Sequence, residues 1–183
     1  EIQSGHLEQV GYDTYCNLLD EVVKEMKGIE VRPETEIQID LNVTSYIPDE
    51  YISDSNQKIE VYQNIALCRN EEDIQNVIDE IIDRFGNMPK ELENLIDIAR
   101  IKYISKKLDI EKIASRKDAV VFTFKASSSE DKFKIDIAQL VKKYGTKIKF
   151  SAGIKPMITL DIGTSSERKV LNDTTKFVKY LLG

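Results

Sequence analysis

The chain is poor in the residues that most often build metal sites and disulfide frameworks. It holds one histidine and two cysteines in 183 residues. Cys16 and Cys68 have no CxxC spacing and no nearby histidine partners. A disulfide framework is therefore not expected, and a reducing, cytoplasmic location is the simplest assignment. His6, the single histidine, lies in a polar N-terminal stretch, where an ordinary polar residue is favoured over a catalytic one.

Motifs of nucleotide-dependent and metal-dependent enzymes are also missing. GxxxxGK[ST], GxGxxG and HExxH do not occur, and acidic pairs such as Asp49 and Glu50 are common in a chain with 32 carboxylate side chains. We therefore expect no catalytic residue, no metal site and no cofactor in this chain. No apolar run reaches the roughly 18 residues of a membrane helix, and the N-terminus lacks the features of a signal peptide. Because the first residue is not methionine, we expect a fragment of a longer protein.

Charge is distributed unevenly along the chain. The net charge of −6 divides into −9 for residues 1–70, −6 for residues 71–100 and +9 for residues 101–183. Such asymmetry is typical of a nucleic-acid surface on the basic part, or of two lobes that attract each other. The count alone does not distinguish these two interpretations.

The pattern of residues 70–108 predicts a helical hairpin. From Glu71 to Phe85 the apolar residues recur at steps of three and one, the spacing of one helix face. These residues are Ile74, Val77, Ile78, Ile81, Ile82 and Phe85. Gly86 is expected to end this helix, and Pro89 lies near the start of the next. The second helix has its own apolar face of Leu92, Leu95, Ile96, Ala99 and Ile104.

The outer face of the first of these helices is acidic. Glu72, Asp79, Glu80 and Asp83 fall on the half of the helix opposite the apolar stripe. Glu80 and Asp83 lie near its C-terminus, where a negative charge opposes the helix dipole by roughly 0.3–1 kcal/mol. One interpretation is a solvated face in which Glu80 pairs with Arg84 at i, i+4. The other is an acidic docking patch.

The elements predicted around this hairpin indicate an α+β fold with a helix-rich N-terminal part and a small, mainly antiparallel sheet covered by helices. Before the hairpin we expect a helix at about 12–27, a half-buried strand at 37–41, a tight turn at Pro48 and Asp49, and a helix beginning near Asp54 or Ser55. After it we expect strands at 110–115, 119–125, 147–151 and 157–163, a helix near 130–144, and a last helix from about Ser165 or Ser166 to Leu182.

Lysines of residues 101–183 are interleaved with aromatic residues. Lys142 and Lys143 precede Tyr144, and Lys149 precedes Phe150. Such a pattern occurs in nucleic-acid-binding surfaces, and we take Lys142 and Lys143 as candidate phosphate contacts. A solvated basic face is the alternative.

Several motifs, in order, resemble the C-terminal domain of the bacterial transcription-repair coupling factor (Mfd) family. They are EIQSGHLEQVGYDTYCNLLDE at the N-terminus, YIPDEYI at 46–52, Ile59-x-x-Tyr62, IDRFG at 82–86 with a proline three residues on, and LIDIAR at 95–100. The resemblance covers most of residues 1–110. Residues 111–183 match that family only in their pattern of elements.

This resemblance implies a regulatory part of a larger machine. Members of the family use an ATP- and Mg-dependent motor on double-stranded DNA to displace stalled RNA polymerase, and a UvrB-like module recruits UvrA. Residues 1–10 would be the tail of the RecG-like translocation motif and a linker, with Gln3, Ser4 and Gly5 closing the motif. Residues 11–183 would be the C-terminal regulatory domain, helix-rich over 11–108 and α+β over 109–183.

The resemblance also assigns a role to the acidic helix. The family's C-terminal domain packs on the UvrB-like module of the same protein and hides its UvrA-binding surface. The acidic residues before Arg-Phe-Gly contribute to that contact and match Glu80 and Asp83, so we expect Glu80, Asp83 and Arg84 to form the intramolecular docking face. We therefore expect a non-catalytic, autoinhibitory domain; the alternative is a nucleic-acid-binding module that uses the basic residues 101–183.

Overall fold

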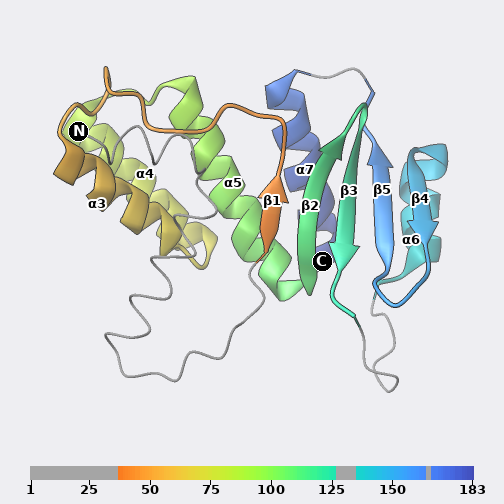
Figure 1. The fold of residues 1–183 in the computed structure, drawn as a ribbon. Helices are drawn as coiled ribbons and strands as arrows, with labels where there is room; N and C mark the ends of the chain where they lie inside the picture. Colours follow the sequence, from red (N-terminus) through yellow and green to blue (C-terminus); the bar gives the residue numbers. More distant parts are fainter. Residues whose placement is uncertain (1–36, 127–134, 164–165) are drawn as a thin grey trace, which may run out of the picture. The chain divides into compact units, whose positions relative to one another are not determined.

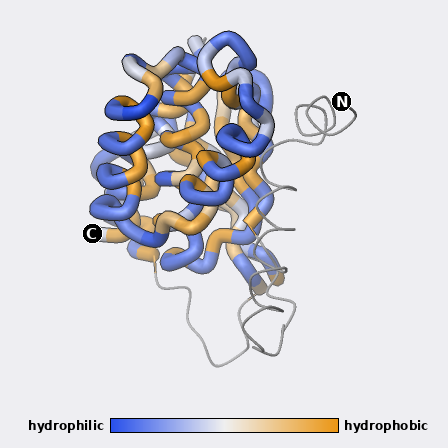
Figure 2. Tube along the Cα trace, turned by 90° about the vertical axis from the view of Figure 1, so that its left-hand side faces the viewer, coloured by the Kyte–Doolittle hydropathy of each residue, from blue (hydrophilic) through white to orange (hydrophobic). Residues whose placement is uncertain are grey.

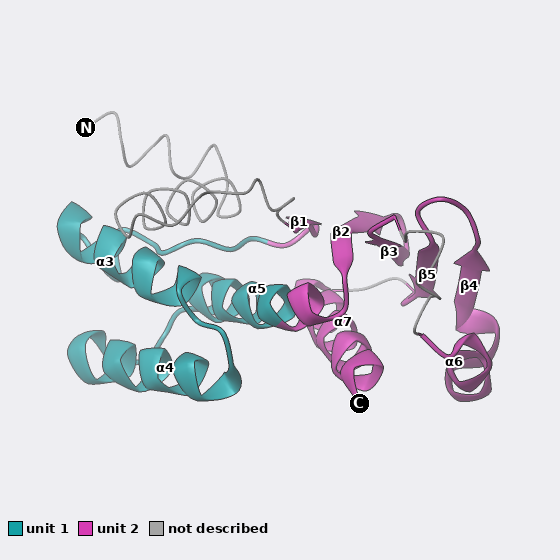
Figure 3. Cartoon of the chain, turned by 90° about the horizontal axis from the view of Figure 1, so that it is seen from below, with its two compact units in different colours: residues 1–36, 44–103 teal, residues 37–43, 104–183 magenta. Residues whose placement is uncertain are grey.

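The computed structural model describes residues 37–126, 135–163 and 166–183. They belong to two compact units (Figure 3). Within the described residues, the first unit holds residues 44–103, and the second holds 37–43 together with the parts described after residue 103. The helix predicted at 12–27 lies outside the described residues, as do Gln3, Ser4 and Gly5.

In the described part of the first unit the chain forms helices α3 (Ser55–Ala66), α4 (Glu71–Phe85) and α5 (Lys90–Lys107), the last of which continues past Tyr103 into the second unit (Figure 1). The predicted start of α3 is confirmed, because the Asp54 side chain accepts a hydrogen bond from the Gln57 amide at 2.9 Å. The predicted turn before it is also confirmed, since the Tyr51 amide donates to the Pro48 carbonyl at 3.0 Å.

Helix α4 has the bounds predicted from its periodicity. Ile74 and Ile81 are buried, at 0% and 2% exposure, whereas Ile82 is 42% exposed. The prediction that Ile82 belongs to the buried face is wrong. At 100° per residue Ile82 lies a quarter-turn beyond Ile81 and projects from the side of the helix.

Helix α5 is buried on more than one side. The five apolar residues predicted to face the core are all buried, and so are four polar ones, Asn94, Asp97, Lys102 and Ser105. The Asn94 amide nitrogen donates to the Thr44 carbonyl at 2.9 Å, which satisfies a buried polar group. Helix α5 is therefore the central helix of the first unit.

The second unit contains a five-stranded sheet. Its strands are β1 (Gln38–Asp40), β2 (Ile110–Arg116), β3 (Ala119–Phe124), β4 (Ile148–Ser151) and β5 (Met157–Asp161). Their order is β1-β2-β3-β5-β4; the β1–β2 pair is parallel and the other three pairs are antiparallel. The predicted small, mainly antiparallel sheet is confirmed.

One face of this sheet carries the core. Ile113, Phe122 and Ile158 lie opposite one another on β2, β3 and β5 and are all 0% exposed. Helices α6 (Ile137–Tyr144) and α7 (Glu167–Leu182) lie on the same side of the sheet (Figures 1 and 3). Phe177 of α7 contacts Phe122, with ring centroids 4.6 Å apart. The expected helical cover of the sheet is thus present.

The hydropathy of the helices agrees with their packing. Hydrophobic and hydrophilic residues alternate along the described helices (Figure 2), as expected for helices that bury part of their surface. Among the described residues, none of the helices combines the length and the apolar character needed to cross a bilayer.

Candidate docking site on helix α4

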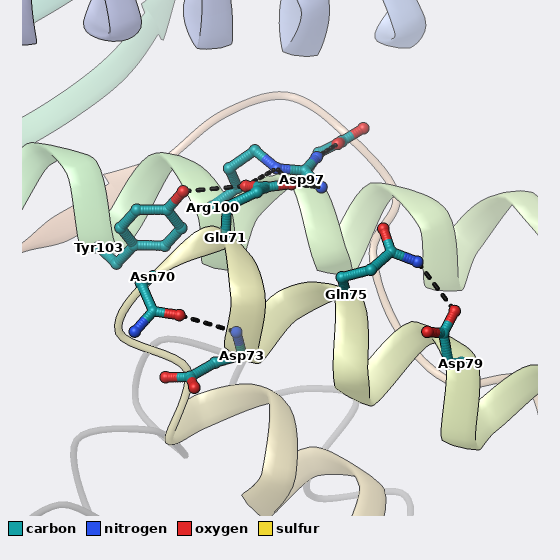
Figure 4. Close-up of polar contacts among 8 residues, drawn as sticks. All are labelled: Asn70, Glu71, Asp73, Gln75, Asp79, Asp97, Arg100 and Tyr103. Carbon is teal, nitrogen blue, oxygen red and sulfur yellow. Dashed lines mark hydrogen bonds and ion pairs between the residues drawn. The ribbon is translucent and has the colours of Figure 1, made fainter.

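The start of α4 is fixed by local hydrogen bonds. The Asn70 side chain accepts a hydrogen bond from the Asp73 amide at 2.8 Å and caps the helix (Figure 4). The Asp73 carboxylate in turn accepts from the Arg69 amide at 3.0 Å. Because Glu71, Glu72 and Asp73 fill the first turn, negative charge here complements the helix dipole.

A charged cluster joins the start of α4 to α5. Arg100 donates from two guanidinium nitrogens to the Glu71 carboxylate, with a closest distance of 2.8 Å, and from a third to Asp97 at 2.7 Å (Figure 4). The Tyr103 hydroxyl donates to the same Glu71 carboxylate at 2.9 Å. Burial, together with this hydrogen bond to Glu71, raises the pKa of Tyr103 to about 12. Two-pronged pairing of this kind restricts orientation, so it sets how α4 lies on α5.

The end of α4 is held by the turn at residues 48–52. Gly86 ends the helix with φ of 86° and ψ of −163°, and its amide donates to the Ile82 carbonyl at 2.9 Å. The Tyr51 hydroxyl donates to the Gly86 carbonyl, and the Tyr51 ring lies 6.0 Å from that of Phe85. Both ends of α4 are therefore braced within the first unit.

The outer face of α4 is acidic and exposed. Glu72, Asp79, Glu80 and Asp83 are all exposed. Asp79 accepts a hydrogen bond from the Gln75 side chain at 2.9 Å (Figure 4). Neither Glu72 nor Asp83 has an ion-pair or hydrogen-bond partner for its side chain within the described part of the chain. We call these four residues the α4 acidic face.

Arg84 borders this face and neutralises part of it. Its guanidinium lies 3.4 Å from the Glu80 carboxylate and 3.3 Å from that of Glu60 on α3. It also stacks over the Phe85 ring, 5.0 Å from the centroid. The local pairing of Glu80 with Arg84 considered from the sequence is present. Asp83 is exposed and has no such partner among the described residues.

The lysines predicted as phosphate contacts lie outside the α4 acidic face. Lys142 and Lys143 lie in the last turn of α6, in the second unit, and both are exposed. Within the ranges the structure describes, no group of three or more His, Cys, Asp or Glu side chains is arranged to hold a metal ion.

The cluster around Arg100 was not predicted from the sequence. Its partners Glu71 and Arg100 are on different helices, 29 residues apart, so no i, i+4 rule connects them. The local signal available was the i, i+3 spacing of Asp97 and Arg100 on α5. Cys68 lies in the same region, where burial, followed by the Asp73 and Glu71 charges, raises its pKa to about 11.

The helical hairpin, the mixed sheet and the α4 acidic face define an α+β domain with an exposed acidic helix. The family model of the TRCF domain matches residues 41–135, and the chain belongs to this family. The resemblance noted from the sequence motifs is thereby confirmed.

The relatives that match this chain are transcription-repair-coupling factors, and they are much longer than it. The chain is 36% identical over 147 residues to the transcription-repair-coupling factor of Bacillus subtilis, an alignment that covers 80% of this chain and 12% of the relative. It is 38% identical over 154 residues to that of Rickettsia typhi, covering 81% of this chain and 13% of the relative. The chain thus corresponds to a small part of these proteins.

A solved structure confirms the fold. The crystal structure of the C-terminal domain of a transcription-repair coupling factor superimposes with a TM-score of 0.65 at 23% sequence identity. The match covers 82% of this chain and 96% of that one. The α+β architecture described above is therefore that of this C-terminal domain.

Proposed function

We propose that this chain is the non-catalytic C-terminal regulatory domain of a cytoplasmic, ATP-dependent double-stranded DNA translocase that couples transcription to repair. In this role it docks on the UvrB-like module of the same protein and masks the surface that binds UvrA. It also restrains ATP hydrolysis and DNA translocation until RNA polymerase is engaged. ATP and Mg would act in the motor, with the Gln3-Ser4-Gly5 tail closing its translocation motif. This chain itself would carry no cofactor.

The observation that best supports docking is the combination of a braced helix and unpaired charge. Asp83 and Glu72 are exposed and have no partner within the described residues, while Glu80 shares Arg84 with Glu60. Carboxylates near a helix C-terminus, such as Asp83, cost the isolated helix roughly 0.3–1 kcal/mol. Docking on a basic surface of the UvrB-like module would convert this local cost into a favourable ion pair.

The energies fit a releasable contact. Ion pairs at the rim of an interface contribute only about 0.2–1 kcal/mol each. Tethering within one chain supplies an effective concentration near the millimolar range, so a weak face can keep a closed state populated. The same weakness would allow RNA polymerase to open the contact.

The test is charge reversal in the intact parent protein. The double variant Glu80→Arg/Asp83→Arg should shift the closed-to-open ratio by about tenfold for each 1.4 kcal/mol lost. Basal ATPase activity, DNA binding and UvrA binding are then all expected to rise severalfold. The control for charge reversal outside the α4 acidic face is the single variant Glu93→Arg, at an exposed carboxylate of α5. A parent whose three activities do not change on the double reversal would contradict the proposal.

A further inference from the structure

The second unit has a basic groove that the proposed docking does not use. It is lined by α6, the short helix η1 (Gly145–Lys147), the end of β5 and α7, and has a volume of about 930 Å³. Its polar lining consists of five lysines, two aspartates and two tyrosines. The lysines are Lys143, Lys147, Lys169, Lys176 and Lys179, the aspartates are Asp161 and Asp173, and the tyrosines are Tyr144 and Tyr180. We call this surface the α6–α7 groove.

The aromatic floor of the groove holds one lysine in place. The rings of Tyr144 and Tyr180 meet edge to face, with centroids 6.0 Å apart. The Lys143 ammonium lies over both, 3.8 Å from the Tyr180 centroid and 5.5 Å from that of Tyr144. Burial, with smaller contributions from Tyr180 and Asp173, raises the pKa of Tyr144, which stays a neutral hydroxyl donor at pH 7.

Most of the positive charge in the groove is not used by the domain itself. Lys169 donates to the Ile162 carbonyl at 2.8 Å and so has a structural role. Lys147, Lys176 and Lys179 are exposed and form no ion pair with any carboxylate in the part of the chain that the structure describes. Uncompensated cations along one groove concentrate anions there.

Dimensions and side-chain types indicate an extended phosphate chain. From Lys169 to Lys179 α7 advances about 15 Å, at roughly 1.5 Å per residue. A strand of duplex DNA places one phosphate per roughly 3.4 Å of helix axis, so several phosphates could lie along that length. No arginine, the side chain that best fits a carboxylate fork, is among the described residues of the lining. Lysines bind phosphate as point charges, without reading base edges.

We infer that the α6–α7 groove binds the phosphodiester backbone of nucleic acid, independently of base sequence, through Lys143, Lys147, Lys176 and Lys179. This inference does not depend on docking by α4, which lies in the other unit. It also separates the two lysines that the sequence placed together, because Lys143 lines the groove and Lys142 does not.

The experiment compares two double variants of the 183-residue chain by fluorescence anisotropy with a labelled DNA duplex at several salt concentrations. Lys176→Ala/Lys179→Ala removes two groove lysines. Lys142→Ala/Lys149→Ala removes two exposed lysines outside the groove and makes the same charge change. Each lost phosphate contact should reduce the slope of log K against log salt by about 0.9, so the groove variant should lose about 1.8. Its affinity at low salt should fall at least tenfold.

The remaining outcomes would overturn the inference. The first is that the unmodified chain binds neither DNA duplex, single-stranded DNA nor RNA at low salt. The second is that the two double variants lose the same affinity for DNA. The third is that polyglutamate binds as tightly as the nucleic acids and that the groove variant no longer binds it, which would make the groove a site for an acidic protein segment. Circular dichroism of both variants checks that the fold is unchanged.

Discussion

At the scale of single residues, neighbouring carboxylates of α4 differ in what they can offer a partner. Glu80 lies 3.4 Å from Arg84, which also reaches Glu60. Asp83 has no partner among the described residues and is exposed. Spacing agrees with this difference, because Glu80 and Arg84 are at i, i+4, whereas Asp83 and Arg84 are adjacent and do not face each other on a helix. The structure therefore makes Asp83 the better single residue for testing docking.

Tyr103 provides a pH-dependent test of the cluster at the start of α4. Its pKa is raised from 10.0 to about 12, first by burial and then by the hydrogen bond to Glu71. Since the folded protein keeps this proton while the unfolded chain loses it, the contribution of Tyr103 to stability should fall as the pH rises from 10 toward 12. In an ultraviolet titration of tyrosinate formation, the difference between the unmodified chain and Tyr103→Phe should correspond to one tyrosine that titrates near pH 12.

Glu71→Gln should bring that late titration to lower pH, because the carboxylate charge that disfavours tyrosinate is removed. Tyr103→Phe identifies the signal by deleting it. A titration above pH 10 that is the same in Tyr103→Phe as in the unmodified chain, or that does not move in Glu71→Gln, would show that the assignment to this hydrogen bond is wrong.

At the scale of secondary-structure elements, α4 depends on the conformation of one glycine. Gly86 has φ of 86° and ψ of −163°, a region that is almost exclusive to glycine, while a methyl group added at this position would meet no atom within 4 Å. Gly86→Ala should therefore lower the free energy of unfolding by about 1–3 kcal/mol through backbone strain alone. Chemical denaturation of the 183-residue chain measures this difference.

Gly153→Ala is the matched control for that substitution. Gly153 lies outside the left-handed region, and its nearest contact for an added methyl group is the Lys155 carbonyl at 4.0 Å. Its free energy of unfolding should change by much less. Equal losses in the two variants would contradict the strain argument.

Much of the element pattern could be predicted from the sequence, because periodicity and caps are local properties. Helix α4 begins and ends where the apolar spacing and Gly86 indicate, and Ser166 caps α7 as expected. The degree of burial around α5 could not be predicted, since Asn94, Asp97 and Lys102 look like solvent-facing residues until their partners are known. The same limit applies to the Glu71–Arg100 pair, which joins two helices.

At the scale of the whole molecule, the two charge regions of the sequence correspond to two different surfaces. The acidic residues 71–100 supply the α4 acidic face in the first unit, and the basic residues 101–183 supply the α6–α7 groove in the second. The sequence offered a docking role and a nucleic-acid role as alternatives. With the two surfaces on separate units, one chain could perform both, and each role has its own test.

Salt should affect these two roles differently. Backbone binding by the groove depends on counterion release and should weaken steeply with salt. Docking by α4 should also weaken with salt, but less steeply, because only the few ion pairs of one helix face contribute to it. A comparison with the parent protein is therefore best made at one fixed ionic strength.

The most direct test of the docking claim is a calorimetric titration of the 183-residue chain against the UvrB-like module of the same parent. We predict that the unmodified chain and Glu93→Arg bind alike, and that Asp83→Arg raises the Kd about tenfold or more, equivalent to about 1.4 kcal/mol. Asp83→Arg should also stabilise the chain itself by about 0.3–1 kcal/mol, because the new cation complements the helix dipole. A module that binds the unmodified chain and Asp83→Arg with equal affinity would contradict the account.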